Sequence, residues 1–197
     1  MALRVTFVAA AGSSSVLAER FEDDRPLDRA GWDEVQRAVP DLLPLAAADL
    51  RYCSPAPRSR ATGEGLGYAP LVQLALRDCD MGRWRGMTLG EVMAREPGAV
   101  DAWLADPRAT PHGGESLLDF IRRLGGWLDT RPLEDGCGAV AVAEPSVIRA
   151  ALVYVLKAPP ATYWSIDVRS LSTIGVAGRP GRWSLCLDGV SAQPLRA

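Results

Sequence analysis

The chain has 197 residues, of which 48% are hydrophobic and 23% charged, and its formal net charge at pH 7 is −2. This composition is typical of a soluble globular protein, and the length suits one domain with a substantial core. The near-neutral charge gives neither the basic stripe of a nucleic-acid-binding surface nor a polyanionic tail. No stretch of the sequence approaches the ~18 apolar residues of a membrane span. We therefore expect a single domain over residues 1–197, without a nucleic-acid or membrane partner.

The cysteine and histidine content argues against a metal centre. The four cysteines show no CxxC spacing: Cys53, Cys79, Cys137 and Cys186. A reduced, cytoplasmic setting is the simplest interpretation of scattered cysteines. His112 is the only histidine, so a zinc site would need thiolates from distant positions. We expect no metal and no cofactor.

Strand and helix patterns alternate through the first part of the chain. β-branched and aromatic residues predict a buried strand over 4–10. Apolar residues at helical spacing predict a helix over 26–39, with Asp28 as its N-terminal cap. A short strand over 49–56 follows, and then a helix over 58–67 that ends at glycines.

The middle of the chain continues this pattern. We predict a third strand over 70–78 and a glycine-rich, charged loop over 79–86. Two short helices, separated by a Pro-Gly step, are predicted over 88–107. The clearest amphipathic helix lies over 115–129, where the apolar residues fall on one stripe.

The last part of the chain is predicted to form a strand, a helix and a hairpin. The strand, a turn at Glu144 and the buried helix are expected over 138–156, and the hairpin follows over 172–187. Strands that alternate with helices in this way imply an α/β sheet with helices on both faces.

Six short motifs follow one another along the chain. They are Ala10-Ala11-Gly12; Pro26-Leu27 with Gly31; Ser54-Pro55 with Arg58 and Thr62; Leu76 with Asp78, Gly82, Trp84 and Gly86; Gly113-Gly114-Glu115-Ser116; and Glu144 with Val147-Ile148-Arg149. In this order they resemble the histidine phosphatase superfamily, also called phosphoglycerate mutase-like. The resemblance covers nearly the whole chain. It implies a three-layer α/β/α sandwich with a mainly parallel central sheet.

The same resemblance implies how the family's catalytic groups map onto this sequence. In the family, the first strand ends in Arg-His-Gly, and that histidine is the nucleophile that becomes a phosphohistidine. A second histidine and two arginines hold the phosphoryl oxygens, and a carboxylic acid protonates the leaving group. Here Ala10 stands in place of the first arginine and Ala11 in place of the nucleophile. Glu144 replaces the second histidine, Asp78 stands at the proton donor, and Arg58 is unchanged.

These replacements lead us to expect a pseudoenzyme that has lost phosphohistidine chemistry. Alanine cannot attack phosphorus, and each lost charge-assisted hydrogen bond removes ~1.5–3 kcal/mol of phosphate binding. One cation, Arg58, would face two carboxylates, a balance that disfavours a phosphate dianion. The old pocket would instead bind a small-molecule ligand or a partner protein, with an oligomer left open. The expected pocket residues are Ala10, Ala11, Gly12, Ser13, Arg58 and His112.

Two alternatives keep catalysis. In the first, Asp78 and Glu144 are the catalytic acid and base of an isomerase, dehydratase or hydrolase on a non-phosphorylated substrate. In the second, the protein is a weak residual phosphohydrolase that uses His112 or water. His112 is then either a base brought over the pocket or an exposed loop histidine.

The state of Glu144 separates the pseudoenzyme from the enzyme. We expect Ala11, Arg58, Asp78 and Glu144 to converge at the carboxyl ends of the strands. If Glu144 pairs with Arg58, it is ionised and neutralises an inherited cation. If it faces Asp78 across an open cavity, one of the two carboxyls holds a proton near neutrality.

Overall fold

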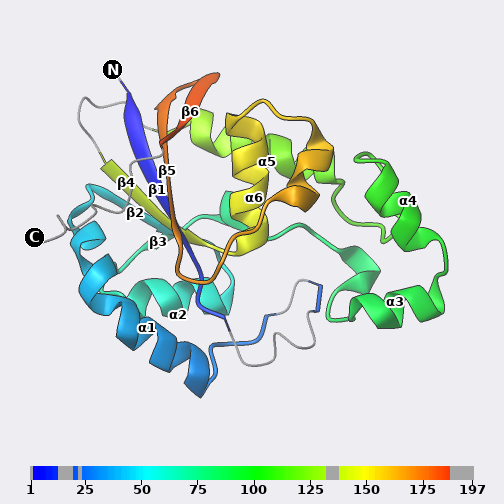
Figure 1. Cartoon of the computed structure of the whole chain (residues 1–197), viewed down its shortest axis with the longest axis horizontal. Coiled ribbons are helices and arrows are strands. Elements are labelled where there is room, and N and C mark those ends of the chain that lie inside the picture. Colours follow the sequence, from blue (N-terminus) through cyan, green and yellow to red (C-terminus); the bar gives the residue numbers. More distant parts are fainter. Residues whose placement is uncertain (1, 13–19, 22–23, 132–137, 187–197) are drawn as a thin grey trace, which may run out of the picture.

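The protein is built on a six-stranded sheet with the strand order β3-β2-β4-β1-β5-β6 (Figure 1). The computed structural model describes residues 2–12, 20–21, 24–131 and 138–186. The strands are β1 (Leu3–Ala9), β2 (Leu50–Cys53), β3 (Leu71–Val72), β4 (Gly138–Ala143), β5 (Thr173–Arg179) and β6 (Arg182–Cys186).

Strands β1 to β4 run parallel, and the C-terminal hairpin adds antiparallel pairs at one edge. β1 pairs with β4 in parallel and with β5 antiparallel, and β2 lies in parallel between β4 and β3. β5 and β6 form the predicted hairpin. The expected α/β fold with a mainly parallel sheet is therefore confirmed.

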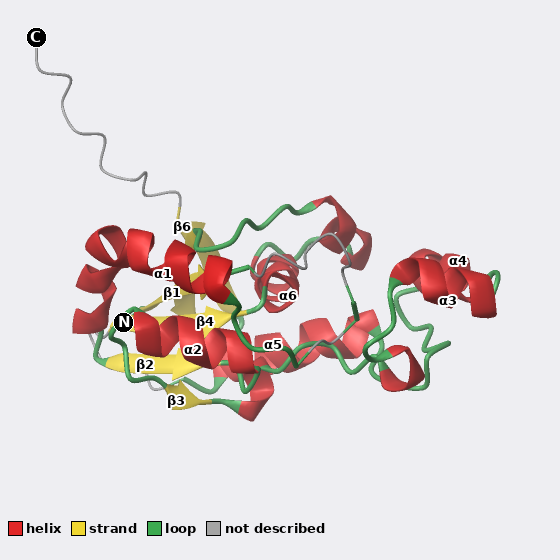
Figure 2. Cartoon of the chain, turned by 90° about the horizontal axis from the view of Figure 1, so that it is seen from below, coloured by secondary structure: helices red, strands yellow, loops and turns green. Residues whose placement is uncertain are grey.

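Helices cover both faces of this sheet (Figures 1 and 2). They are α1 (Arg29–Leu42), α2 (Pro57–Gly65), α3 (Leu89–Arg95), α4 (Ala99–Ala105), α5 (Leu117–Asp129) and α6 (Pro145–Val155). Short 3₁₀ helices cover Leu43–Ala47, Leu74–Leu76, Gly82–Trp84 and Pro160–Ser165. Helices α1 and α2 pack on one face and α5 and α6 on the other, while α3 and α4 lie beside the sheet (Figure 2).

The side chains of the strands alternate between two cores, one on each face. Phe7 of β1 belongs to the core under α5 and α6, and its neighbour Val8 to the core under α1 and α2. The same alternation separates Ala141 from Val142 on β4. This alternation follows from the two-residue period of a strand. It explains why both strands are continuous apolar runs in the sequence.

The helix boundaries follow the local capping residues. The Asp28 side chain accepts a hydrogen bond from the Gly31 amide at 2.9 Å, which starts α1 as predicted. Ser116 caps α5 in the same way, because its hydroxyl accepts from the Asp119 amide. Within the described part of the chain, no helix combines the length and the apolar character needed to cross a bilayer.

The third strand is shorter than the sequence pattern predicts. Only Leu71–Val72 pairs with β2, and the chain then turns into the 3₁₀ helix at Leu74–Leu76. The physical reason is a tertiary contact, since the guanidinium of Arg123 on α5 binds the carbonyls of Ala75 and Arg77. Those carbonyls therefore accept hydrogen bonds from a side chain of α5 and not from the amides of a neighbouring strand.

Candidate active site

The candidate site lies at the carboxyl edge of the parallel strands. Parallel strands end at the same edge, where α/β proteins commonly bind ligands. Ala10 follows β1 and Glu144 follows β4, and the Ala10 amide donates to the Ala143 carbonyl at 2.8 Å. The ends of β1 and β4 are therefore side by side, and the motifs after each strand meet.

A small cavity of about 220 Å³ opens at this edge, and we call it the polar cavity. Its lining residues are Asp24, Pro55, Ala56, Arg58, Arg77, Asp78, Arg85 and Glu144. The structure thus brings together Arg58, Asp78 and Glu144, which come from three separate motifs. Arg58 is placed by the first turn of α2, which begins at Pro57.

The charge balance of the polar cavity differs from the one expected. We predicted a single cation, but three arginines line the cavity together with three carboxylates. Arg85 forms an ion pair with Asp24. The remaining lining charges are Arg58 and Arg77 against Asp78 and Glu144. The expected excess of negative charge is wrong, because Arg77 and Arg85 reach the cavity from the loop that carries Asp78.

Glu144 is buried, with 3% of its surface exposed. Its Oε1 accepts a hydrogen bond from the Ser59 hydroxyl at 2.7 Å, and its Oε2 has no hydrogen-bond partner among the described residues. Burial raises the pKa of the Glu144 carboxyl, and the negative charge of Asp78 raises it further. No ion pair with Arg58 is found in the described part of the chain. Glu144 therefore does not neutralise Arg58, and it lines the polar cavity together with Asp78.

Asp78 carries the second carboxyl of the site. Its Oδ1 accepts from the Cys79 amide at 2.7 Å. Burial raises the pKa of Asp78, while hydrogen bonds and the charges of Arg58 and Arg123 act in the opposite direction. Since like charges repel, the ionised Asp78 raises the cost of ionising Glu144.

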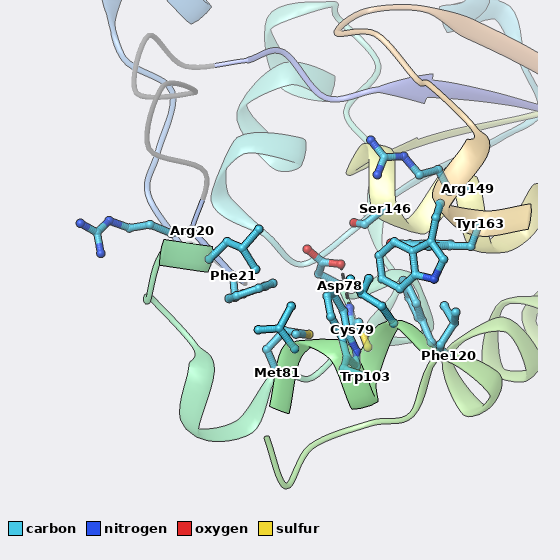
Figure 3. A pocket seen from close by; sticks show the side chains of 15 residues that line it. Arg20, Phe21, Asp78, Cys79, Met81, Trp103, Phe120, Ser146, Arg149 and Tyr163 are labelled. Atoms are coloured by element: carbon cyan, nitrogen blue, oxygen red, sulfur yellow. Dashed lines mark hydrogen bonds between the residues drawn. The ribbon is translucent and has the colours of Figure 1, made fainter. Parts of the chain in front are cut away.

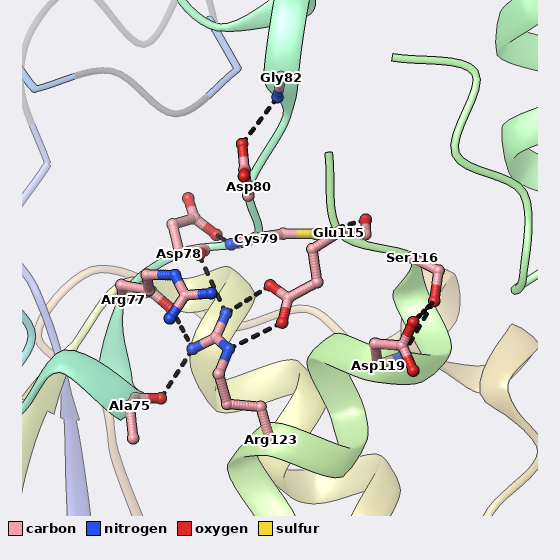
Figure 4. Close-up of polar contacts among 10 residues, drawn as sticks. All are labelled: Ala75, Arg77, Asp78, Cys79, Asp80, Gly82, Glu115, Ser116, Asp119 and Arg123. Atoms are coloured by element: carbon pink, nitrogen blue, oxygen red, sulfur yellow. Dashed lines mark hydrogen bonds and ion pairs between the residues drawn. The ribbon is translucent and has the colours of Figure 1, made fainter. Parts of the chain in front are cut away.

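A guanidinium clamp holds the segment that ends at Asp78 (Figure 4). Arg123 Nη1 donates to the carbonyls of Ala75 and Arg77, at 2.7 and 3.0 Å, and Nη2 donates to the carbonyl of Asp78 at 3.1 Å. Its Nε and Nη2 also form a bidentate pair with Glu115, at 2.8 and 2.6 Å. The fork geometry of arginine suits this task, because five donors lie in one plane. The clamp fixes the position of Asp78 from α5.

The turn after β1 places its alanines in the core and not in the cavity. Ala10 and Ala11 are 4% and 1% exposed, and neither lines the polar cavity. The Ala11 amide donates to Thr62 Oγ1 at 3.0 Å, which ties this turn to α2. Gly12 is half-buried, and Ser13 lies outside the described residues. Of the four residues expected to converge, Ala11 is therefore next to the site but not in its wall.

His112 lies away from the site. It is 1% exposed, so the expectation of an exposed loop histidine is wrong. Its Nδ1 accepts from the Gly114 amide at 3.0 Å, and its ring stands against the rings of Trp84 and Trp103, at 5.1 and 6.4 Å between centroids. Burial lowers the pKa of the imidazole, which favours its neutral form. His112 lines neither cavity described here.

A larger cavity of about 380 Å³ adjoins the polar one, and we call it the aromatic cavity (Figure 3). No sequence motif predicts this cavity. Its aromatic lining residues are Phe21, Trp103, Phe120, Tyr163 and Trp164, and its polar ones include Arg20, Asp78, Ser146 and Arg149. Asp78 lines both cavities. Asp78 therefore lies at the border between the two cavities.

Comparison with known proteins defines the class of this fold and site. The family model of the histidine phosphatase superfamily (branch 1) matches residues 18–187. The chain belongs to this superfamily, as its motifs predict.

Several similar proteins with names or solved structures come from mycobacteria. A glucosyl-3-phosphoglycerate phosphatase of Mycolicibacterium vanbaalenii is 34% identical over 172 residues, covering 77% of this chain and 75% of the relative. The protein of that name from Mycobacterium tuberculosis is 31% identical over 155 residues, covering 66% and 67%. A mycobacterial glucosyl-3-phosphoglycerate phosphatase in complex with VO3 superposes with a TM-score of 0.76 at 26% identity, covering 93% of this chain and 96% of that one. A structure described as mycobacterial hydrolase 1 gives a TM-score of 0.77 at 26% identity, covering 95% and 98%.

These relatives correct our interpretation of function. We expected a pseudoenzyme that binds a ligand or a partner in an old phosphate pocket. The relatives that match most of the chain are named as phosphatases, and they overturn that expectation.

Proposed function

We propose that this protein is a phosphohydrolase that cleaves phosphomonoesters in the polar cavity by direct attack of water. The observation that carries the proposal is the arrangement of Asp78 and Glu144, two carboxyls with raised pKa values, around one cavity with Arg58 and Arg77. Titratable groups whose pKa values are raised towards neutrality suit general acid–base catalysis. The names of the phosphatase relatives support the same class of reaction.

Water is the proposed nucleophile because no histidine lies in the cavity. In our interpretation this chain is a degenerate member of its superfamily, with Ala11 and Glu144 at the positions of the two catalytic histidines. His112 is the only histidine of the sequence, and it is buried against Trp84 and Trp103. A phosphohistidine intermediate therefore has no residue on which to form near Arg58.

The proposed reaction is a single displacement at phosphorus. Arg58 and Arg77 bind the phosphoryl oxygens, for which guanidinium groups have suitable donor geometry. Water attacks phosphorus opposite the ester oxygen, and the Glu144 carboxylate accepts a proton from it. The bond between phosphorus and the ester oxygen breaks, and the Asp78 carboxylic acid gives its proton to that oxygen. The products are the alcohol and inorganic phosphate, and the proton on Glu144 returns to Asp78 through solvent.

The positions of Asp78 and Glu144 give the two carboxyls different roles in the proposed reaction. Asp78 lines both cavities, so it lies where a leaving group would pass from one cavity to the other. Glu144 is the more deeply buried of the two and lines only the polar cavity. Asp78 is therefore the acid and Glu144 the base.

The test is hydrolysis of p-nitrophenyl phosphate and 3-phosphoglycerate by the purified chain between acidic and neutral pH. We expect turnover that falls by about 10²-fold or more in Asp78→Asn and Glu144→Gln, the usual range for loss of a general acid or base. Asp41→Asn and Glu64→Gln, exposed residues of α1 and α2, serve as matched controls and should keep wild-type rates. No turnover, or turnover that both site variants retain, would contradict the proposal.

A further inference from the structure

Asp78 lines both the polar and the aromatic cavity, and its position indicates where the leaving group of a phosphomonoester would lie. A phosphomonoester whose phosphoryl group occupies the polar cavity has its ester oxygen at Asp78, if the proposed function holds. The group beyond that oxygen then enters the aromatic cavity. A cavity of about 380 Å³ falls within the usual size of small-molecule sites, so it can hold a ring with substituents.

The walls of the aromatic cavity are flat and apolar. The rings of Trp103 and Trp164 stand 4.7 Å apart between centroids at 73°, and Tyr163 and Trp164 stand 4.8 Å apart at 89°. Such ring faces and edges bind another aromatic ring well. Most of its lining side chains are aliphatic or aromatic, and the charged ones are Arg20, Asp78 and Arg149. The lining therefore favours an aromatic ring over a sugar.

Two arginines, Arg20 and Arg149, line this cavity, and Arg20 is already paired with Glu91. Arg149 lines the cavity, and its guanidinium carbon lies 5.9 Å from the centre of the Tyr163 ring. Its Nε is buried without a hydrogen-bond partner, and no carboxylate of the described residues forms an ion pair with it. Arg149 is half-buried and its guanidinium has no carboxylate partner among the described residues, so this position is suited to a negatively charged ligand group.

Three polar residues of the cavity lie near one another, while Arg20 lies apart from them (Figure 3). Figure 3 shows Asp78, Ser146 and Arg149 together, opposite Met81 and Trp103. Ser146 and Arg149 are three residues apart on α6, so they share one face of the helix and are separated by ~4.5 Å along its axis. A ligand that reaches both Asp78 and Arg149 thus has two polar ends joined by a flat apolar body.

We propose that the aromatic cavity binds the leaving alcohol as an aromatic ring that bears a carboxylate. The ring lies against Trp103 and Trp164, the carboxylate binds Arg149, and the hydroxyl oxygen lies at Asp78. This inference rests on the proposed function only for the origin of that hydroxyl. The ligand class differs from the glucosyl compound in the names of the relatives.

The test measures binding of the alcohols alone, without any reaction. Affinities of the intact protein for 4-hydroxybenzoate, phenol and glycerate are determined by calorimetry and by quenching of tryptophan fluorescence. We expect 4-hydroxybenzoate to bind about tenfold more tightly than phenol, since one charge-assisted pair contributes that much. Glycerate should bind more weakly than 4-hydroxybenzoate by at least about tenfold, because it lacks the ring.

Five variants test the proposed contacts of Arg149 and Trp164. Arg149→Gln should reduce the affinity for 4-hydroxybenzoate to that for phenol, and Arg149→Lys should retain part of the difference. Arg122→Gln, an exposed arginine on α5, is the matched control and should change neither affinity. Trp164→Ala should weaken both aromatic ligands, whereas Trp32→Ala on α1 should weaken neither. Circular dichroism confirms that each variant is folded.

The outcomes separate this inference from the proposed function. Equal binding of glycerate and 4-hydroxybenzoate, or an unchanged preference in Arg149→Gln and Arg149→Lys, would overturn the inference. If 4-hydroxybenzoate binds as expected but 4-carboxyphenyl phosphate is not hydrolysed, only the proposed function fails. If phosphomonoesters are hydrolysed while the alcohols show no preference for a ring, only the inference fails.

Discussion

The Ser59 hydroxyl donates a 2.7 Å hydrogen bond to Glu144 Oε1, joining α2 to the end of β4 across 85 positions of the chain. Both residues are buried, and Ser59 follows Arg58 directly. The bond favours the ionised form of a carboxyl whose burial favours the neutral form. In the proposed mechanism, Ser59 therefore helps to set the pH at which Glu144 acts as the base.

Removing this hydroxyl should shift the pH dependence of hydrolysis. In Ser59→Ala the pKa of Glu144 rises further, so a higher pH is needed to ionise the base. We expect the acidic limb of the pH profile of kcat to move to higher pH, with the basic limb unchanged. Ser184→Ala, on the exposed face of β6, is the control. An acidic limb that stays in place would exclude Glu144 as the base.

The raised pKa of Glu144 should also appear in stability. A carboxyl with a higher pKa in the folded protein than in the unfolded chain binds more protons when folded. Its stabilising contribution is complete below the unfolded pKa of about 4.3 and is lost as the pH rises through the folded pKa. Glu144→Gln should therefore raise the midpoint of thermal unfolding at pH 7 relative to wild type, and much less at pH 4.

The size of this effect follows from linkage, since each pKa unit corresponds to about 1.4 kcal/mol of unfolding free energy. Scanning calorimetry of the wild type and Glu144→Gln at the two pH values measures it. Glu64→Gln, on the exposed side of α2, should show no such pH dependence. A larger gain at pH 4 than at pH 7 would mean that the pKa of Glu144 is lowered and not raised.

Arg123 should act on hydrolysis through Asp78. The Arg123–Glu115 pair is 15% and 11% exposed, so its hydrogen bonds are shielded from solvent. In Arg123→Lys the charge remains but the planar fork is lost, and we expect kcat to fall about tenfold, with a smaller change in KM. In Arg123→Gln the charge is lost as well. The pKa of Asp78 then rises, and the basic limb of the pH profile moves to higher pH.

Kinetics and thermal unfolding of both Arg123 variants distinguish positioning from a purely structural role. Arg122→Gln, the next residue on α5, is the control because its side chain is exposed. Loss of stability without any movement of the basic limb in Arg123→Gln would show that the clamp does not act through the proton on Asp78.

The stereochemistry at phosphorus should reveal a single displacement. Direct attack of water inverts the configuration, whereas a phosphoenzyme requires two displacements and retains it. We expect inversion when an isotopically chiral phosphorothioate monoester is hydrolysed in labelled water and the product is examined by phosphorus NMR. Retention, or a radiolabelled phosphoprotein trapped by acid quenching, would contradict the proposed use of water.

Local signals in the sequence were sufficient to predict most of the fold. The apolar stripe predicts α5, and the apolar run before Glu144 predicts β4, because these elements are specified by neighbours in the chain. The predicted third strand over 70–78 was too long. Its carbonyls bind Arg123, and a contact between residues more than 40 positions apart leaves no trace in local periodicity.

The site was predicted in part. Asp78 and Glu144 each belong to a motif, and the common edge of parallel strands brings such motifs together. Arg77 and Arg85 were missed because the path of a loop decides which side chains reach a cavity. The burial of His112 was missed for a related reason, since it depends on Trp103, which comes from a separate helix.

The shortness of β3 also affects how the molecules behave at high concentration. An exposed edge strand presents unpaired amide and carbonyl groups on which a strand of another molecule can add. At this edge only Leu71 and Val72 are in register with β2, and the chain then coils into a 3₁₀ turn. Two residues offer too short a template for intermolecular β-pairing. The same arginine that fixes Asp78 thus also protects one border of the sheet against aggregation.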